Sequence, residues 1–174
     1  MKVKEISFVG IFAALLILFS LITIPTPLVP FTLQTLAVLI IGGTLRPKLA
    51  ISTVALYLLL GFVGLPVFAG GASSGPASFL LPTGGFLISF LLEVSFLSIM
   101  TSKFVKYDHY SFVYPLLASV INLVFGWIWF KFDTGMTWKV SLFTSLVPFI
   151  IPEIVKCVIS TFVSQKLRVI IHNK

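Results

Sequence analysis

Long apolar runs separated by short polar or proline-containing breaks cover almost the whole chain. The first run, residues 6–24, carries no charge and ends at Pro25. Because proline lacks the amide hydrogen that a helix interior needs, this break predicts a helix followed by a stiff loop. A helix that crosses a bilayer needs about 20 apolar residues. The pattern predicts an all-α membrane domain over residues 1–174 with six spans, at residues 6–24, 31–45, 49–61, 84–101, 112–130 and 140–164.

Two segments depart from this simple pattern. Residues 31–45 are short for a crossing, so we expect neighbouring helices to shield their ends or the bilayer to thin locally. Residues 61–83 hold glycine, serine, alanine and proline but no charge. An uncharged apolar loop favours burial, and glycines let a backbone approach a ligand closely. We therefore expect this loop to cover an outward-facing pocket, with a passive linker as the alternative.

The composition excludes a water-soluble fold. Apolar residues make up 58% of the chain and charged residues 10%, whereas soluble domains average about 25% charged residues. Six crossings use about 120 residues, which leaves only short loops and no room for a catalytic domain outside the membrane. We expect a multi-pass protein of the cell membrane that is not an enzyme.

The distribution of basic residues predicts the orientation. The net charge is +7, from 12 Lys and Arg against 5 Asp and Glu. On one side of the predicted spans lie Lys2, Lys4, Arg46, Lys48, Lys103, Lys106, Lys166, Arg168 and Lys174. On the other side lie Lys131 and Lys139, with Trp127, Trp129 and Trp138 around them as an aromatic belt. Basic residues concentrate in cytoplasmic loops, so both termini are expected in the cytoplasm.

Few residues are candidates for chemistry. The two histidines, His109 and His172, fall in predicted loop or tail without a second ligand at metal-binding spacing. The sequence has no phosphate-binding loop, so an ATP-driven process would need another subunit. No metal or cofactor site is expected.

Four polar residues inside the predicted spans matter most, because charge at membrane depth is costly and usually faces a wet cavity. Glu153 and Lys156 are three residues apart, hence on one helix face, and Pro148 and Pro152 interrupt the same segment. We favour a substrate role for this pair over a structural ion pair. For Glu93 we favour a structural role, including pairing with Lys156, and for Asn122 an interhelical hydrogen bond over ligand binding.

Three motifs give the chain a recognisable relationship. They are VPFTLQTLAV at residues 29–38, GLPVFAGG at residues 64–71 and PTGGF at residues 82–86. In this order they closely resemble motifs of the BioY family, the biotin-binding S components of energy-coupling factor (ECF) transporters. The resemblance extends over nearly the whole chain.

The resemblance implies a six-helix vitamin-binding subunit with a pocket near the outer face, closed by the loops after the first and third helices. Its partners would be a membrane coupling subunit and two ATPases of the ABC type, which use the ATP, and self-association remains open. Gly10 and Ala14, one turn apart, match the small-residue face that such subunits present to the coupling subunit, with packing inside the bundle as the alternative. The substrate-binding residues expected are Gln34, Phe68, Gly70, Gly71, Thr83, Trp127, Glu153 and Lys156.

The resemblance implies that the acid and the lysine of the last helix contact the ureido ring of biotin. Here the segment reads PFIIPEIVK over residues 148–156, so Glu153 replaces the usual aspartate and Ile151-Pro152 replaces Pro-Gly. These departures leave a biotin precursor or another vitamin as alternative substrates. A membrane assembly protein without transport activity is the alternative of a different class. Glu93, where the family has a small residue, is a second departure.

Overall fold

A computed structural model describes residues 3–26, 28–71, 75–104 and 111–172. The described part is almost entirely helical. Its α-helices are α1 (Val3–Leu21), α2 (Gln34–Thr44), α3 (Pro47–Phe62), α4 (Gly84–Phe104), α5 (Val113–Thr134), α6 (Trp138–Ser145) and α7 (Ile150–His172). Three single 3₁₀ turns, η1 (Ala69–Gly71), η2 (Gly75–Phe79) and η3 (Val147–Phe149), and a strand pair, β1 (Thr23–Ile24) with β2 (Phe31–Thr32), complete it.

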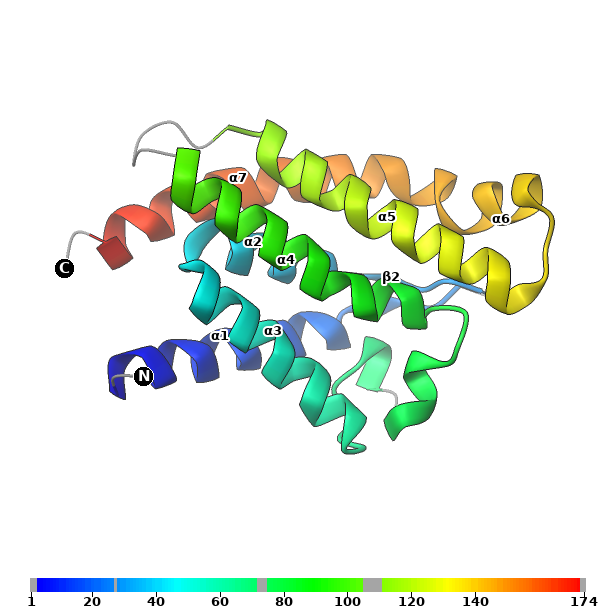
Figure 1. Cartoon of the computed structure of the whole chain (residues 1–174), viewed down its shortest axis with the longest axis horizontal. Helices are drawn as coiled ribbons and strands as arrows, with labels where there is room; N and C mark the ends of the chain where they lie inside the picture. Colours follow the sequence, from blue (N-terminus) through cyan, green and yellow to red (C-terminus); the bar gives the residue numbers. More distant parts are fainter. Residues whose placement is uncertain (1–2, 27, 72–74, 105–110, 173–174) are drawn as a thin grey trace.

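The helices form a bundle with α2 at its centre. In Figure 1, α2 and α4 lie between α1 and α3 on one side and α5 to α7 on the other, and α2 packs against both α7 and α4. All residues of α2 except Thr35 are buried. Its neighbours therefore shield this short helix from lipid, which is one of the two solutions that its length allows.

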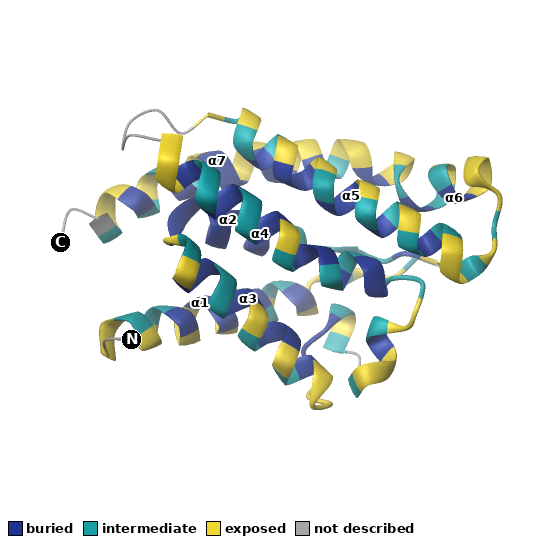
Figure 2. Cartoon of the chain, in the orientation of Figure 1, coloured by how far each residue is buried: buried dark blue, intermediate teal, exposed yellow. Residues whose placement is uncertain are grey.

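The surface of the bundle is apolar. Four described segments are long and apolar enough to cross a membrane, namely Val3–Leu21, Gly84–Phe104, Val113–Thr134 and Trp138–Ile171. Figure 2 shows exposed positions recurring along the outer faces of these helices. Many exposed positions are large and hydrophobic, among them Ile11, Leu18, Val120, Ile159 and Phe162. Such a surface suits hydrocarbon rather than water, in agreement with the all-α membrane fold that the sequence predicts.

The last predicted span, residues 140–164, is not one continuous helix. It consists of α6, the turn η3 and α7, and α7 continues to His172. Pro148 lies in the turn, where its ring and missing amide hydrogen prevent a regular helix. Pro152 is tolerated because it occupies the first turn of α7, where amide hydrogens have no intrahelical acceptor. The break lets a new helix begin inside the bundle.

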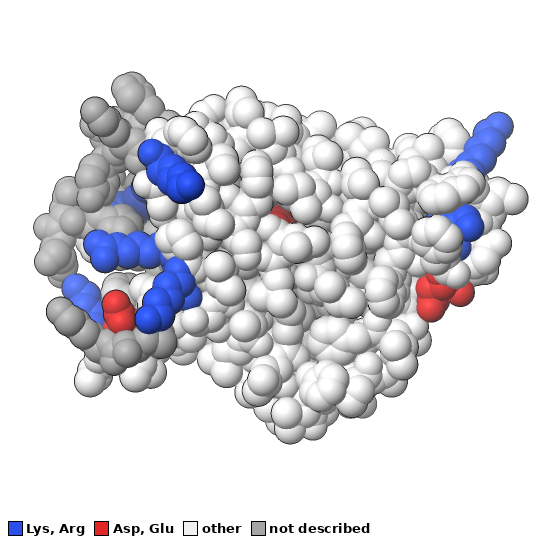
Figure 3. All heavy atoms as spheres, in the orientation of Figure 1, with Lys and Arg blue, Asp and Glu red and all other residues white. Residues whose placement is uncertain are grey.

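On the face shown in Figure 3, most charged side chains gather at the two ends of the bundle, and the middle shows only a small acidic spot. The first turn of α1, the α2–α3 junction and the last turns of α4 and α7 lie at the end that holds both chain termini (Figure 1). These segments carry Lys4, Arg46, Lys48, Lys103 and Lys166. Lys131 and Lys139 flank the opposite end, where α5 meets α6. The cytoplasmic location of the termini remains a prediction from this asymmetry.

Candidate substrate-binding site

A cavity of about 220 Å³ lies in the half of the bundle away from the basic end. Its wall comes from the β1–β2 connection, the start of α2, the loop after α3, and parts of α4, α5, η3 and α7. Most of the wall is apolar, with Phe68, Phe86, Phe90, Leu123 and Phe149 contributing. The polar side chains of Glu153 and Lys156 line it as well.

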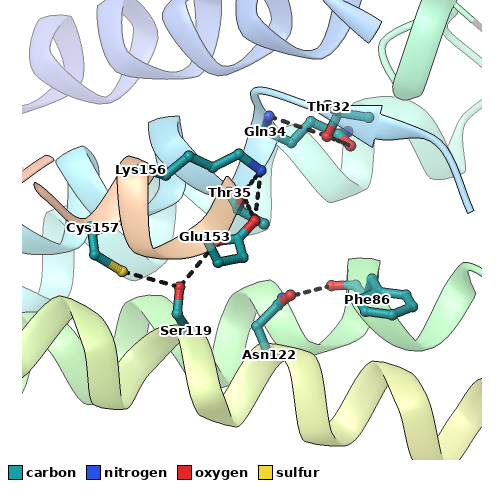
Figure 4. Close-up of polar contacts among 9 residues, drawn as sticks. All are labelled: Thr32, Gln34, Thr35, Phe86, Ser119, Asn122, Glu153, Lys156 and Cys157. Atoms are coloured by element: carbon teal, nitrogen blue, oxygen red, sulfur yellow. Dashed lines mark hydrogen bonds and ion pairs between the residues drawn. The ribbon is translucent and has the colours of Figure 1, made fainter. Parts of the chain in front are cut away.

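Glu153 and Lys156 form a buried ion pair. Lys156 Nζ lies 2.6 Å from Glu153 Oε1, and the two residues are 8% and 4% exposed, Lys156 being the more exposed. Lys156 Nζ also donates to Thr35 Oγ1 at 2.7 Å, while Thr35 Oγ1 donates to Glu153 Oε1 at 2.8 Å. Ser119 Oγ donates to Glu153 Oε2 at 3.1 Å (Figure 4). The pair thereby ties α7 to α2 and α5.

The helix break explains why an acid can sit here. Glu153 falls in the first turn of α7, and unpaired amide groups at a helix N-terminus stabilise negative charge there. Lys156 follows one turn later on the same face. The interruption around Pro148 thus places a charged pair at the wall of an apolar cavity.

Gln34 is a second polar group on the cavity wall. It is 4% exposed, and its Nε2 donates to the hydroxyl of Tyr57 on α3. Thr32 Oγ1 donates to Gln34 Oε1 at 3.0 Å, so both ends of the amide are held. Thr83, just before α4, also lines the cavity.

The loop after α3 contributes to the cavity through its aromatic residue. Phe68 is buried, meets Tyr57 edge-on at a ring-centroid distance of 5.4 Å and lies against the backbone of Gly61. Gly70 and Gly71 do not line the cavity. Both have positive φ angles, 68° and 73°, and the amide of Gly70 donates to Thr23 Oγ1. These glycines shape the turn that carries Phe68. Residues 72–74 of the same loop lie outside the described part.

Trp127 lies away from the cavity wall. Its Nε1 donates to Ser141 Oγ on α6 at 3.0 Å, and its ring meets Trp138 edge-on. It therefore joins α5 to α6.

Two contacts of the ion pair, Thr35 and Ser119, were not expected from the sequence. Thr35 lies within the first motif, and Ser119 is one helical turn from Asn122. These positions are the only indications in the sequence that the two residues belong to the site.

Asn122 makes an interhelical hydrogen bond and also lies on the cavity wall. Its Nδ2 donates to Phe86 O at 3.3 Å and to Ser89 Oγ at 2.7 Å, which links α5 to α4. The same residue lines the cavity. The interhelical hydrogen bond that the sequence favours is present, and Asn122 lines the cavity while it makes this bond.

Glu93 does not pair with Lys156. It is fully buried on α4, and neither carboxyl oxygen has a hydrogen-bond partner among the described residues. It lies close enough to Glu153 and Lys156 to interact with both electrostatically. A carboxyl group in this position lowers stability in either protonation state, and most when it is ionised, because burial without a partner removes its hydration.

The site as a whole suits a small neutral polar group attached to an apolar body. One carboxylate and one ammonium supply an acceptor and a donor, and the surrounding wall is apolar. Within the described ranges, no three His, Cys, Asp or Glu side chains gather as metal ligands would. The arrangement provides polar groups that can orient a ligand against an apolar wall.

Comparison with known proteins gives one consistent relationship. The sequence model of the BioY family matches residues 1–173. The biotin transporter BioY2 of Lactococcus lactis subsp. cremoris (strain MG1363) is 36% identical over 174 residues, covering 99% of this chain and 94% of the relative. The biotin transporter BioY of Thermotoga maritima is 31% identical over 166 residues, covering 91% of this chain and 92% of the relative.

A solved structure shares the fold. The crystal structure of the S-component for biotin from an ECF-type ABC transporter matches with a TM-score of 0.85 at 29% identity. The match covers 96% of this chain and 92% of that chain.

Proposed function

We propose that this chain, which belongs to the BioY family, is the biotin-binding membrane subunit of an ECF importer. The observation that carries the proposal is the Glu153–Lys156 pair on the wall of an apolar cavity. A cyclic urea has two N–H donors and a carbonyl acceptor. Glu153 would accept from the ring, and Lys156 would donate to its carbonyl, as charge-assisted hydrogen bonds in a largely apolar pocket.

The remaining wall suits the apolar parts of biotin. Its thioether ring and aliphatic chain are apolar, and Phe68, Phe86, Phe90 and Phe149 offer aromatic surface to them. Gln34 and Thr83 would complete the polar contacts, whereas Gly70 and Gly71 would act through the conformation of the loop that carries Phe68. For Trp127 the proposed role is indirect, through the packing of α6.

Titration calorimetry on the purified protein in detergent tests this function. Biotin should bind with one site per chain, and unrelated water-soluble vitamins such as thiamine and riboflavin should not compete. Dethiobiotin, which keeps the cyclic urea but lacks the thioether ring, separates biotin from a precursor as the preferred ligand. No binding of biotin in saturating titrations, or stronger binding of another vitamin, would contradict the proposal.

Transport would require partner subunits, and α1 offers the proposed contact. Gly10 and Ala14 are both exposed, and a Cβ added at Gly10 would meet nothing within 4 Å. Small residues on an exposed helix face let a second helix approach closely in lipid. We place the membrane coupling subunit on this face, with two ABC-type ATPases supplying the energy.

A bulky side chain at this face should separate transport from binding. Gly10→Leu should abolish ATP-dependent biotin uptake in cells that hold the complete transporter, and the biotin affinity of the isolated subunit should stay within about twofold of the wild-type value. Ile11→Leu, at an exposed position beside it, is the matched control. Equal loss of uptake and of binding in Gly10→Leu would mean that this position serves folding instead.

A further inference from the structure

We propose that Asn122 is a specificity-determining contact that accepts a hydrogen bond from one of the two ureido N–H groups of the ligand. This inference rests on the proposed function. The ion pair has a limited number of free hydrogen-bonding positions for a ligand. A carboxylate has about four acceptor positions. Glu153 already accepts from Thr35, Lys156 and Ser119, which leaves one.

The same count applies to Lys156. Its ammonium has three N–H donors, of which two are directed at Thr35 Oγ1 and Glu153 Oε1. One donor is left, and the single carbonyl of a cyclic urea takes it. The ring, however, brings two N–H groups, and Glu153 has room for one. A second N–H without an acceptor would be left unsatisfied in an apolar cavity, which lowers affinity.

Asn122 supplies the missing acceptor. Both hydrogens of its amide are used, one on the carbonyl oxygen of Phe86 and one on Ser89 Oγ. A carbonyl oxygen accepts only, so the contact with Phe86 requires the amide nitrogen to face α4. The Oδ1 atom must then face away from α4, and none of the described residues donates to it. Asn122 lines the cavity, so this fixed acceptor is available to a ligand.

The spacing on α5 suits one ring. Asn122 lies three residues after Ser119, which contacts the Glu153 carboxylate. Three residues advance a helix by about 4.5 Å and keep the same face, so Asn122 lies about one turn along α5 from the residue that contacts the Glu153 carboxylate. The other amide on the wall, Gln34, already accepts from Thr32. Among the described wall residues, Asn122 is the amide whose oxygen has no donor.

Calorimetry with two ligand analogues tests this contact. Each analogue replaces one ureido N–H of biotin by a ring oxygen. Asn122→Leu should lower biotin affinity by about tenfold to a hundredfold, because one N–H is left without a partner. The analogue that lacks the N–H directed at Asn122 should have the same affinity for the Asn122→Leu variant as biotin has, because the variant cannot make that hydrogen bond with either ligand. The other analogue, which loses the contact to Glu153, should still bind that variant more weakly than biotin.

The controls separate ligand contact from helix packing. Thr101→Val removes another buried hydrogen bond of α4, to Gly42 O, away from the cavity, and should leave biotin affinity within about twofold. Asn122→Ser provides a second variant with the same expected pattern if Asn122→Leu does not fold, as judged by thermal unfolding. Unchanged biotin affinity in the folded variants, or undiminished discrimination against both analogues, would overturn the inference. Wild-type protein that does not bind biotin would instead overturn the proposed function itself.

Discussion

Glu93, Glu153 and Lys156 are buried in the interior of a bundle whose surface is apolar, and their surroundings differ. Glu153 and Lys156 form an ion pair, and Glu153 also accepts hydrogen bonds from the hydroxyl groups of Thr35 and Ser119. Glu93 has no hydrogen-bond partner among the described residues. A buried pair often fails to recover the hydration that both partners lose. Retaining such a pair beside a cavity is therefore consistent with a ligand role.

Replacing both partners separates that role from a structural one. In Glu153→Leu/Lys156→Met, thermal stability should remain equal to that of the wild type or rise, because both desolvation costs disappear together. Biotin binding measured by calorimetry should be lost. The conservative Glu153→Asp should change biotin affinity by about tenfold or more, since retracting the carboxylate displaces a charge-assisted hydrogen bond worth about 1.5–3 kcal/mol. Full retention of affinity in both variants would remove the pair from the site.

Glu93 leads to the opposite expectation. Glu93→Met keeps a long side chain and removes a carboxyl group that has no described partner, so the melting temperature should stay the same or increase. Biotin affinity should change by less than about threefold. Thermal unfolding in detergent and calorimetry on the same preparation check both points. A large loss of stability would show that the carboxyl group has a stabilising interaction in the membrane.

At the scale of the elements, α4 and α5 are joined by two reciprocal close contacts. A Cβ at Gly85 would come 2.2 Å from Cβ of Trp129, and a Cβ at Gly126 would come 2.2 Å from the ring of Phe86. Each helix thus provides a glycine that receives an aromatic ring of the other. Phe86 also lines the cavity, so this packing positions one wall of the site.

An added methyl group at this contact should reach the site. Gly126→Ala should push the Phe86 ring toward the cavity, lower biotin affinity by about tenfold and lower the melting temperature, because overpacking costs about 1–3 kcal/mol. Gly10→Ala is the matched control, since its new methyl group meets nothing within 4 Å. Calorimetry and thermal unfolding of the two variants provide the comparison. Equal behaviour of the two variants would mean that α4 and α5 adjust without disturbing the pocket.

At the scale of the whole molecule, charge and cavity lie at different ends. The basic residues of α1, of the α2–α3 junction and of the ends of α4 and α7 share one end, and the cavity lies in the other half. Positive residues favour the cytoplasmic side. The cavity would then be reached from outside the cell, as the proposed importer requires.

Thiol labelling tests this orientation. The single cysteine, Cys157, is buried, so single-site cysteine variants have little background. In intact cells Lys139→Cys should react with a membrane-impermeant maleimide, whereas Lys48→Cys should react only after the cells are broken. Both positions are exposed lysines, which makes them a matched pair. The reverse pattern would invert the orientation and the direction of access.

The sequence alone determined the membrane class, the family and the charged pair of the last segment. Hydropathy is a property of each segment by itself. Charged residues such as Glu153 and Lys156 are costly to insert into a membrane in any packing arrangement, so the sequence alone identifies them as candidates for a functional site. Hydropathy also indicated that residues 31–45 are too short to face lipid alone, although it did not say which helices cover them.

Only the tertiary structure decided which polar groups meet. Thr35, Ser119 and Glu153 come from three helices remote in sequence, so no spacing predicts their contacts. The orientation of the Asn122 amide depends on Phe86 and Ser89 across the α4–α5 interface. Trp127 turns toward α6, although its place in the sequence is equally compatible with a pocket. The direction of a side chain depends on how helices pack, and the hydrophobic pattern of a membrane helix contains little of that information because lipid and protein neighbours are both apolar.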